Sequence, residues 1–142
     1  MTFTVFFTVE GTPIGKGRPK FARRGSFVTT YTPTKTRDYE SLIAEAARKA
    51  MGSSEPLETP IAAYIYIVVP VPQSYPKKRR DACLNGLERP TKKPDADNIL
   101  KAFFDAMNGI VYKDDCQIVS IHATKNYGPV GMVEVMVKED ID

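Results

Sequence analysis

The sequence predicts one α/β domain with a small mixed β-sheet and two main helices. Segments typical of strands and segments typical of helices alternate along the chain. The length of 142 residues is enough for one hydrophobic core and short for two. A hydrophobic fraction of 42% with 26% charged residues is ordinary for a globular protein. We therefore treat residues 1–142 as a single domain.

The first half of the chain contains a predicted strand, a loop and a helix. Residues 3–11 (FTVFFTVEG) are rich in β-branched and aromatic side chains, which indicates a strand. Residues 12–27 are punctuated by glycine and proline, which predicts a loop. A helix is predicted within residues 31–52, because apolar side chains recur there at every third or fourth position and Gly52 can end it.

The middle of the chain contains a second predicted strand and a long connection. Residues 61–72 (IAAYIYIVVPVP) form a nearly continuous apolar run, which is typical of a central strand buried on both faces. Residues 73–94 are polar and basic, and they predict a connection that can enclose a short helical turn.

A second helix and two further strands are predicted near the C-terminus. The helix runs from about residue 98 to residue 108, with Asp97 or Asn98 as its N-cap and Gly109 at its end. Residues 117–128 and 131–139 alternate like strands, and the turn YGPVG between them predicts a hairpin. The resulting element order gives one mixed sheet with helices packed on it.

Charge is distributed unevenly along the chain, although the net charge is only +3. Residues 1–93 carry 16 Lys and Arg against 8 Asp and Glu, which gives +8. Residues 94–142 carry 4 against 9, which gives −5. A basic body around an acidic pocket suits a polyanionic partner that is bound together with divalent cations.

The two cysteines and the N-terminus predict a cytoplasmic protein. Cys83 and Cys116 are too few for a disulfide framework and lie in no C-x-x-C pattern, so we expect free thiols in a reducing compartment. The N-terminal residues lack the basic start and long apolar run of a signal peptide. No apolar stretch approaches the length that spans a membrane.

An acidic cluster lies within residues 91–117 (TKKPDADNILKAFFDAMNGIVYKDDCQ). Asp95 and Asp97 are two positions apart in chain that leads into a helix, so their carboxylates can project to the same side. Asp114 and Asp115 stand on the returning segment, at the entry to the next strand. If that strand lies beside the first pair, one of these two carboxylates completes a three-carboxylate site.

Oxygen ligands of this kind suit hard divalent ions, above all Mg²⁺ or Mn²⁺. Zinc is disfavoured, because His122 is the only histidine and neither cysteine has a partner at ligand spacing. Neighbouring carboxylates resist joint ionisation, so a cluster without a cation is electrostatically costly. The cluster therefore predicts a metal-dependent enzyme that acts on phosphate esters.

Lys101 follows Asp97 by four residues, one helical turn later on the same face. One interpretation is an ordinary surface ion pair with Asp97. The other is a cation that holds the scissile phosphate or stabilises charge in the transition state. We favour the second, because this lysine adjoins the predicted metal site. Asp105, two turns beyond Asp97, is either a supporting residue or a solvated one.

Basic side chains in two glycine- and proline-containing segments, together with a lysine near the end of a predicted strand, are candidates for gripping phosphates. The candidate DNA-binding residues are Lys16, Arg18, Lys20, Arg23, Arg24, Lys77, Lys78, Arg79, Arg80 and Lys125.

The segment KPDADNILKAFFDAMNGIVYKDDCQIV resembles the signature of the RusA family of Holliday-junction resolvases, which are small homodimeric endodeoxyribonucleases common in prophages. The close resemblance covers roughly residues 93–119, and a looser one covers the whole chain. D-x-D alone is a weak signal. D-x-D-N-x-x-K followed by Y-x-D-D-x-Q is a specific one.

The resemblance implies a metal site and a catalytic lysine by position. The metal-binding and catalytic carboxylates would be Asp95, Asp97 and Asp115, and the catalytic lysine would be Lys101. The role of Asp114 is left open. The resemblance also implies an intertwined homodimer with a mixed α/β sheet.

These features together predict a Mg²⁺-dependent endonuclease, with Mn²⁺ as a possible substitute, that resolves four-way DNA junctions by paired symmetric nicks in recombination and repair. The metal would activate the attacking water, and Lys101 would balance the charge that develops. The alternatives are a non-catalytic protein that binds branched DNA, or a metal-dependent phosphoesterase or D-x-D transferase with another class of substrate.

Overall fold

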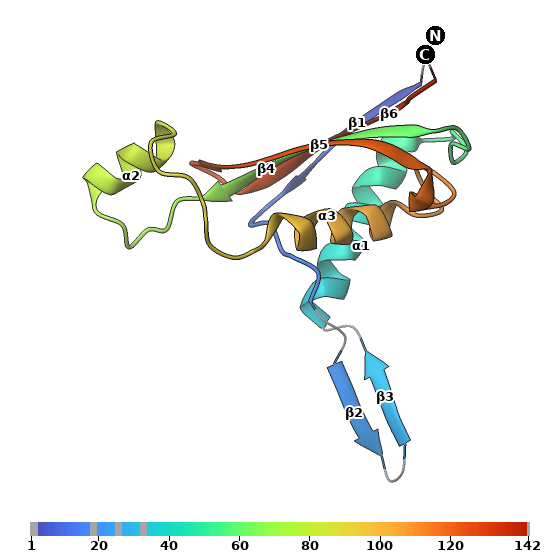
Figure 1. Cartoon of the computed structure of the whole chain (residues 1–142), viewed down its shortest axis with the longest axis horizontal. Helices are drawn as coiled ribbons and strands as arrows, with labels where there is room; N and C mark the ends of the chain where they lie inside the picture. Colours follow the sequence, from blue (N-terminus) through green and yellow to red (C-terminus); the bar gives the residue numbers. More distant parts are fainter. Residues whose placement is uncertain (1–2, 18–19, 25–26, 32–33, 142) are drawn as a thin grey trace.

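The computed structural model describes residues 3–17, 20–24, 27–31 and 34–141 (Figure 1). Strands and helices follow one another along the chain as the apolar patterns predict, with one additional strand pair and one additional helix. The elements are β1 (Thr4–Glu10), β2 (Lys20–Arg24), β3 (Phe27–Tyr31), α1 (Thr34–Met51), β4 (Ile61–Pro70), α2 (Lys77–Leu84), α3 (Ala96–Met107), the 3₁₀ turn η1 (Asp115–Gln117), β5 (Ile118–Gly128) and β6 (Met132–Glu139).

The main sheet has four strands in the order β1-β6-β4-β5. β4 pairs in parallel with β5 and antiparallel with β6, and β1 pairs antiparallel with β6. The predicted single α/β domain with a mixed sheet is therefore confirmed. The predicted β5–β6 hairpin is wrong, because β4 lies between these two strands and pairs with both.

The connection from β5 to β6 passes the end of β4 and approaches the residues that follow β1. A Cβ atom at Gly131 would lie 2.9 Å from backbone atoms of Gly11 and Thr12, so only glycine allows this approach. The turn residues that suggested a hairpin serve a connection that crosses over one strand. A hairpin turn and a crossover connection can both contain glycine and proline, so the sequence alone does not distinguish them.

Residues 12–27 were predicted as a loop, and this prediction is wrong for part of the segment. β2 and β3 form a separate two-stranded antiparallel sheet, in which Phe21 pairs with Thr30. This hairpin extends away from the main sheet and its helices (Figure 1). The β-branched and aromatic residues of β3 supply a partner strand for the basic segment.

Helices α1 and α3 cover one face of the main sheet and build the core with it (Figure 1). The rings of Tyr39 on α1 and Phe103 on α3 meet edge to face with centroids 5.8 Å apart. The strands contribute alternating buried side chains to the same core: Val5, Phe7, Val9, Ile61, Ile65, Ile67, Val133, Val135 and Val137.

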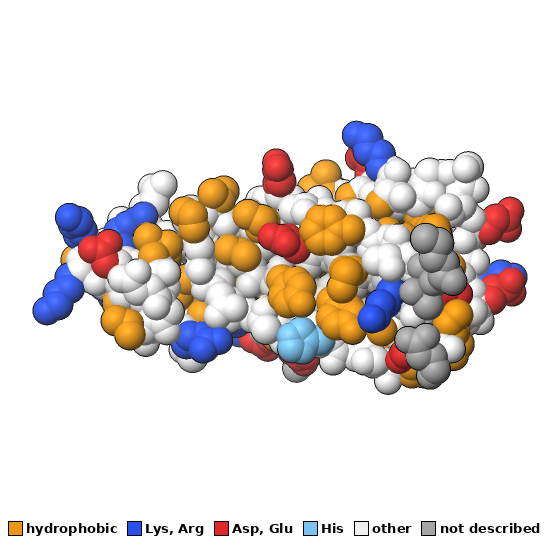
Figure 2. All heavy atoms as spheres, turned by 90° about the horizontal axis from the view of Figure 1, so that it is seen from above, with side chains coloured by type: hydrophobic (Ala, Val, Ile, Leu, Met, Phe, Trp, Pro, Cys, Tyr) orange, Lys and Arg blue, Asp and Glu red, His pale blue; other side chains and the backbone are white. Residues whose placement is uncertain are grey.

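The other face of the sheet is open, and apolar side chains gather on it around the histidine (Figure 2). Phe6 is 58% exposed and Tyr66 is 38% exposed on this face. His122 lies on the same face, with its ring centroid 6.1 Å from that of Tyr64 and 6.0 Å from that of Tyr66. The prediction that β4 is central is confirmed, but the prediction that both of its faces are buried is wrong.

Both cysteines carry free thiols, as predicted; Cys83 is buried and Cys116 is exposed. Among the helices of the described residues, none is both long enough and apolar enough to cross a membrane.

Candidate active site

The first turn of α3 presents two of the predicted carboxylates. Asp95 is the N-cap residue, in extended conformation, and Asp97 follows inside the first turn. Both side chains are exposed. The predicted caps Asp97 and Asn98 are wrong by two or three positions, and the Asp95 side chain accepts no capping hydrogen bond. Its carboxylate remains available, and negative charge at a helix N-terminus is electrostatically favourable.

The chain segment just before Asp95 is tied to the sheet. The ammonium group of Lys125 on β5 donates hydrogen bonds to the carbonyl oxygens of Lys92 and Pro94, both at 2.9 Å. Lys125 was predicted to bind DNA. Its contacts give it a positioning role, because they fix the approach of the chain to Asp95.

The loop after β1 packs against the first turn of α3 from another side. The backbone N–H of Lys16 donates to the carbonyl oxygen of Asn98 at 2.9 Å. A Cβ atom at Gly15 would lie 3.0 Å from the Cβ of Asn98, so this contact is close even for glycine. The loop and the helix start therefore form one rigid wall.

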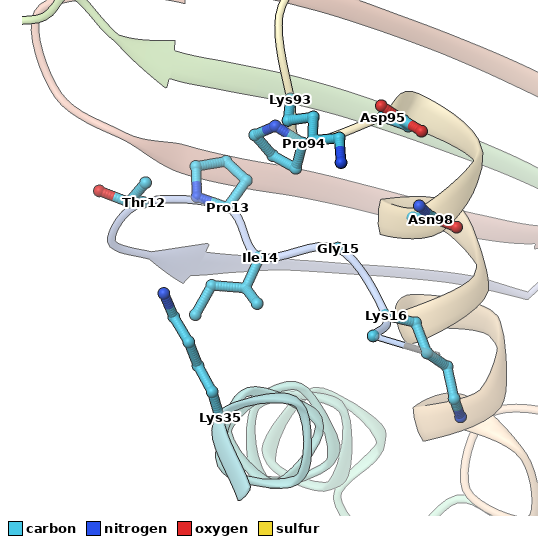
Figure 3. A pocket seen from close by; sticks show the side chains of 11 residues that line it. Thr12, Pro13, Ile14, Gly15, Lys16, Lys35, Lys93, Pro94, Asp95 and Asn98 are labelled. Carbon is cyan, nitrogen blue, oxygen red and sulfur yellow. The ribbon is translucent and has the colours of Figure 1, made fainter. Parts of the chain in front are cut away.

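An open cleft of about 680 Å³ lies beside this wall (Figure 3). Asp95 and Lys93 contribute side chains from the start of α3, and Lys35 contributes one from the start of α1. A cleft lined by a carboxylate and two lysines suits a DNA strand whose phosphates are bound together with a cation. Sequence reasoning missed Lys35 and Lys93, because both lie outside the two basic clusters that were singled out.

The end of α3 holds Asp115, the third predicted carboxylate. The side-chain oxygen of Asn108, the residue after α3, accepts a hydrogen bond of 2.8 Å from the backbone N–H of Asp115. The buried hydroxyl of Tyr112 donates to the carbonyl oxygen of Phe104 on α3 at 2.7 Å. These two bonds hold the turn that carries Asp115 against the last turn of α3.

Gln117 holds the same turn against the chain segment that precedes β4. Its amide donates to the carbonyl oxygens of Leu57 and Thr59 at 2.9 and 3.0 Å, and its side-chain oxygen accepts from the backbone N–H of Asp114 at 2.9 Å. Asp114 in turn accepts from the backbone N–H of Cys116 at 3.1 Å. Much of the Y-x-D-D-x-Q motif thus serves to build the turn.

Asp114 and Asp115 are in different electrostatic settings. The hydrogen bond from the backbone N–H of Cys116 lowers the pKa of Asp114. Loss of solvation raises the pKa of Asp115, and the neighbouring Asp114 raises it further. Asp114 is engaged as a cap, so Asp115 is the better candidate for a ligand at this end.

The two ends of α3 are far apart within one chain. A helix of 12 residues is about 18 Å long at 1.5 Å per residue. Asp95 and Asp97 lie at its start and Asp115 beyond its end. Across the parts of the chain that the structure describes, no three His, Cys, Asp or Glu residues are grouped closely enough to hold a metal ion. The expected convergence of the three carboxylates is not found within a single chain.

Lys101 lies on the exposed side of α3, one turn after Asp97. Among the described ion pairs, none joins these two side chains, so the ordinary surface ion pair is not formed. Asp105 instead binds Lys16, whose ammonium nitrogen lies 2.8 Å from Asp105 Oδ2 and 3.0 Å from Glu40 Oε1. The catalytic role of Lys101 stays a prediction.

The predicted DNA-binding residues fall into three groups. Lys77 and Lys78 are exposed at the start of α2. Several others are engaged within the protein: Lys16 with Glu40 and Asp105, Arg79 with Glu88, Arg80 with the Pro72 carbonyl, and Lys125 with the segment before Asp95. Arg18 and the side chains of Lys20, Arg23 and Arg24 lie outside the described residues.

Comparisons with known proteins identify the family of this chain. A family model described as "Endodeoxyribonuclease RusA" matches residues 10–138. The uncharacterized protein YqaN of Bacillus subtilis (strain 168) is 36% identical over 135 residues, which cover 94% of each chain. Both matches include the two ends of α3 and the turn that carries Asp115.

Proposed function

The chain belongs to the endodeoxyribonuclease RusA family, and on this premise we propose that it is a Mg²⁺-dependent nuclease that resolves four-way DNA junctions. The observation that carries the proposal is the cleft at the start of α3, which is lined by Asp95 together with Lys35 and Lys93. Such a cleft can hold a DNA strand by its phosphates while a cation sits at the carboxylates.

We propose that Asp95, Asp97 and Asp115 are the metal ligands. Their donor chemistry fits Mg²⁺ or Mn²⁺, which prefer carboxylate oxygens and keep several waters. Their positions do not fit within one chain, because about 18 Å of helix separates the two ends of α3. A second copy of the chain supplies the missing end.

A homodimer with its two-fold axis perpendicular to α3 satisfies this requirement. The two α3 helices then run antiparallel, and the start of each lies beside the end of the other. Surface near α3 is available for such pairing. β5 is an edge strand, and it exposes Val119 by 64% and Ile121 by 54%. Exposed apolar side chains on an edge strand are typical of an interaction surface.

The chain's own residues then have distinct tasks in phosphodiester hydrolysis. Lys35 and Lys93 bind the phosphates of the strand to be cut. Lys101 stabilises the negative charge that develops on the scissile phosphate. When bound, Mg²⁺ supplies a Lewis acid and lowers the pKa of the attacking water. Two identical sites related by the dimer axis match the two symmetric nicks that resolution needs.

The test is cleavage of matched substrates with and without Mg²⁺. We expect paired nicks in a synthetic four-way junction only when Mg²⁺ is present, and little cleavage of linear duplex or small phosphate esters. Junction binding without any cleavage would support the alternative of a non-catalytic DNA-binding protein. Rapid hydrolysis of small phosphate esters would support a phosphoesterase of another class.

A further inference from the structure

The segment around α2, which we call the α2 extension (residues 73–93), lies at one end of the molecule, away from the chain termini (Figure 1). It carries seven Lys and Arg against two acidic residues, a net charge of +5. Basic side chains are visible at this end of the molecule (left in Figure 2). Apart from Lys93, which lines the cleft, and the carbonyl of Lys92, which accepts a hydrogen bond from Lys125, the extension has no part in the site described above.

The α2 extension exposes a large apolar side chain to solvent. Leu87 is 82% exposed, more than any other large hydrophobic side chain that the structure describes. Leu84 beside it is 45% exposed. A single exposed leucine is common on protein surfaces. The unusual feature is a pair of exposed leucines, one at the end of α2 and one in the turn after it, within a strongly basic segment.

The backbone beneath these leucines is rigid. The N–H groups of Leu87 and Glu88 both donate to the carbonyl oxygen of Ala82, at 2.9 and 3.2 Å. Gly86 makes the turn with a φ of 78°, a conformation that favours glycine. Cys83, four residues before Leu87 in the last turn of α2, is buried and anchors the end of the helix. Leu87 therefore points outward because the turn directs it there.

Side chains brace the turn from the far side. Glu88 accepts hydrogen bonds from the guanidinium group of Arg79 at 3.0 and 3.1 Å. The same guanidinium group lies 3.7 Å from the centre of the Tyr75 ring, as a cation–π contact. Lys92 donates to the Tyr75 hydroxyl at 3.1 Å. This arrangement fixes Leu87 relative to Lys77 and Lys78, whose ammonium groups are exposed.

We propose that Leu87, supported by Leu84, is a wedge that inserts between unstacked bases at the branch point of a DNA junction. Apolar side chains on basic proteins enter base steps in this way, and the cost is lowest where stacking is already interrupted. Lys77 and Lys78 bind the flanking phosphates. This inference rests on the proposed function, and it assigns the preference for branched DNA to the α2 extension.

The test measures binding in Ca²⁺ or EDTA, so that cleavage does not interfere. The variants are Leu87→Ala and, as a matched control, Leu42→Ala, which truncates a 53% exposed leucine on α1. We expect Leu87→Ala to weaken junction binding about tenfold, the effect of losing one buried leucine contact, and to leave duplex binding unchanged. 2-Aminopurine at the branch point should brighten with the wild type and stay dim with Leu87→Ala.

Leu87→Phe should keep both the affinity and the fluorescence change, because an aromatic ring also stacks between bases. If the wild type prefers the junction and Leu87→Ala equals it in affinity and fluorescence, the wedge is wrong while the proposed function stands. That result would point to a protein partner for this surface. If the wild type binds junction and duplex with equal affinity, the proposed function is wrong, and the wedge, which depends on it, is wrong as well.

Discussion

The two ends of α3 carry the same chemical group in two different settings. At the start, Asp95 and Asp97 are exposed, Asp95 lines an open cleft, and the side chain of Asp95 accepts no capping hydrogen bond. Beyond the end, Asp115 stands in a turn fixed by hydrogen bonds, and its pKa is raised by loss of solvation and by Asp114. Each end is rigid, but neither is a complete metal site. In the proposed dimer, the second chain would therefore bring the two ends together and would leave the local geometry of each end unchanged.

The largest expected effect is that of removing one ligand at the open end. Asp97→Asn should reduce junction cleavage about a thousandfold, because the stabilisation supplied by a bound cation is worth several kcal/mol. Junction binding should persist or tighten, since one negative charge near the phosphates is lost. Gel assays of cleavage and binding measure both quantities. Asp38→Asn on α1, another exposed aspartate, is the matched control and should cleave normally. A wild-type cleavage rate for Asp97→Asn would show that Asp97 is not a metal ligand.

A mixture of two inactive variants tests directly whether the ends of α3 work across two chains. In a heterodimer of Asp97→Asn with Asp115→Asn, one shared site carries both changes and the other carries neither. After subunit exchange in an equal mixture, about a quarter of all sites should be intact if two-fold symmetry pairs the ends. Nicking of one junction strand should therefore return. If both variants are inactive alone and the mixture stays inactive, the site is not shared between chains.

Lys101 should show the next largest effect, because it lies near the start of α3 without being a metal ligand. Lys101→Ala should slow cleavage about a hundredfold, as expected for the loss of one charge-stabilising donor. Its melting temperature should be unchanged, since no ion pair of the described residues involves it. Lys49→Ala, an exposed lysine in the last turn of α1, is the control. A wild-type rate for Lys101→Ala would reduce this lysine to a surface residue.

Much of the fold followed from sequence because local pattern and burial agree. The strand at Thr4–Glu10 alternates strictly between exposed and buried positions, and α3 buries one apolar stripe. The errors arose where local patterns are shared by different structures. The turn sequence after β5 is compatible both with a hairpin and with a crossover connection. The strands β5 and β6 do not pair because β4 lies between them.

The sequence indicated where the candidate carboxylates lie along the chain, but not how they are arranged in space. The D-x-D spacing located the start of α3, and the D-D pair located the turn beyond its end. The sequence did not show that Asn108 and Gln117 hold that turn, because their partners are backbone groups. The sequence also did not show that the full length of α3 separates Asp95 and Asp97 from Asp115. This separation follows from the hydrogen bond that holds the Asp115 turn at Asn108, directly after the helix.

Lys16 contacts residues near both ends of α3, and its replacement should have the smallest effect on DNA binding and cleavage. Its backbone contacts Asn98 near the start of α3, and its ammonium group binds Asp105 near the end and Glu40 on α1. Burial alone would lower the pKa of Lys16, but the hydrogen bonds to Asp105 and Glu40 outweigh it and the pKa is raised above 10.5. The stabilisation is therefore complete at neutral pH and is lost only as pH rises above 10.5.

Lys16→Met should lower the free energy of unfolding at neutral pH by about 1 kcal/mol, because it leaves two partly buried carboxylates facing each other and the pair is screened by partial exposure. Thermal melting measures this change. Adding Glu40→Gln and Asp105→Asn removes the repulsion and should restore part of the loss. Junction affinity should change less for Lys16→Met than for Lys78→Ala, whose ammonium group is exposed. The opposite ranking, with unchanged melting, would return Lys16 to the DNA-binding surface and show that its ion pairs open when DNA binds.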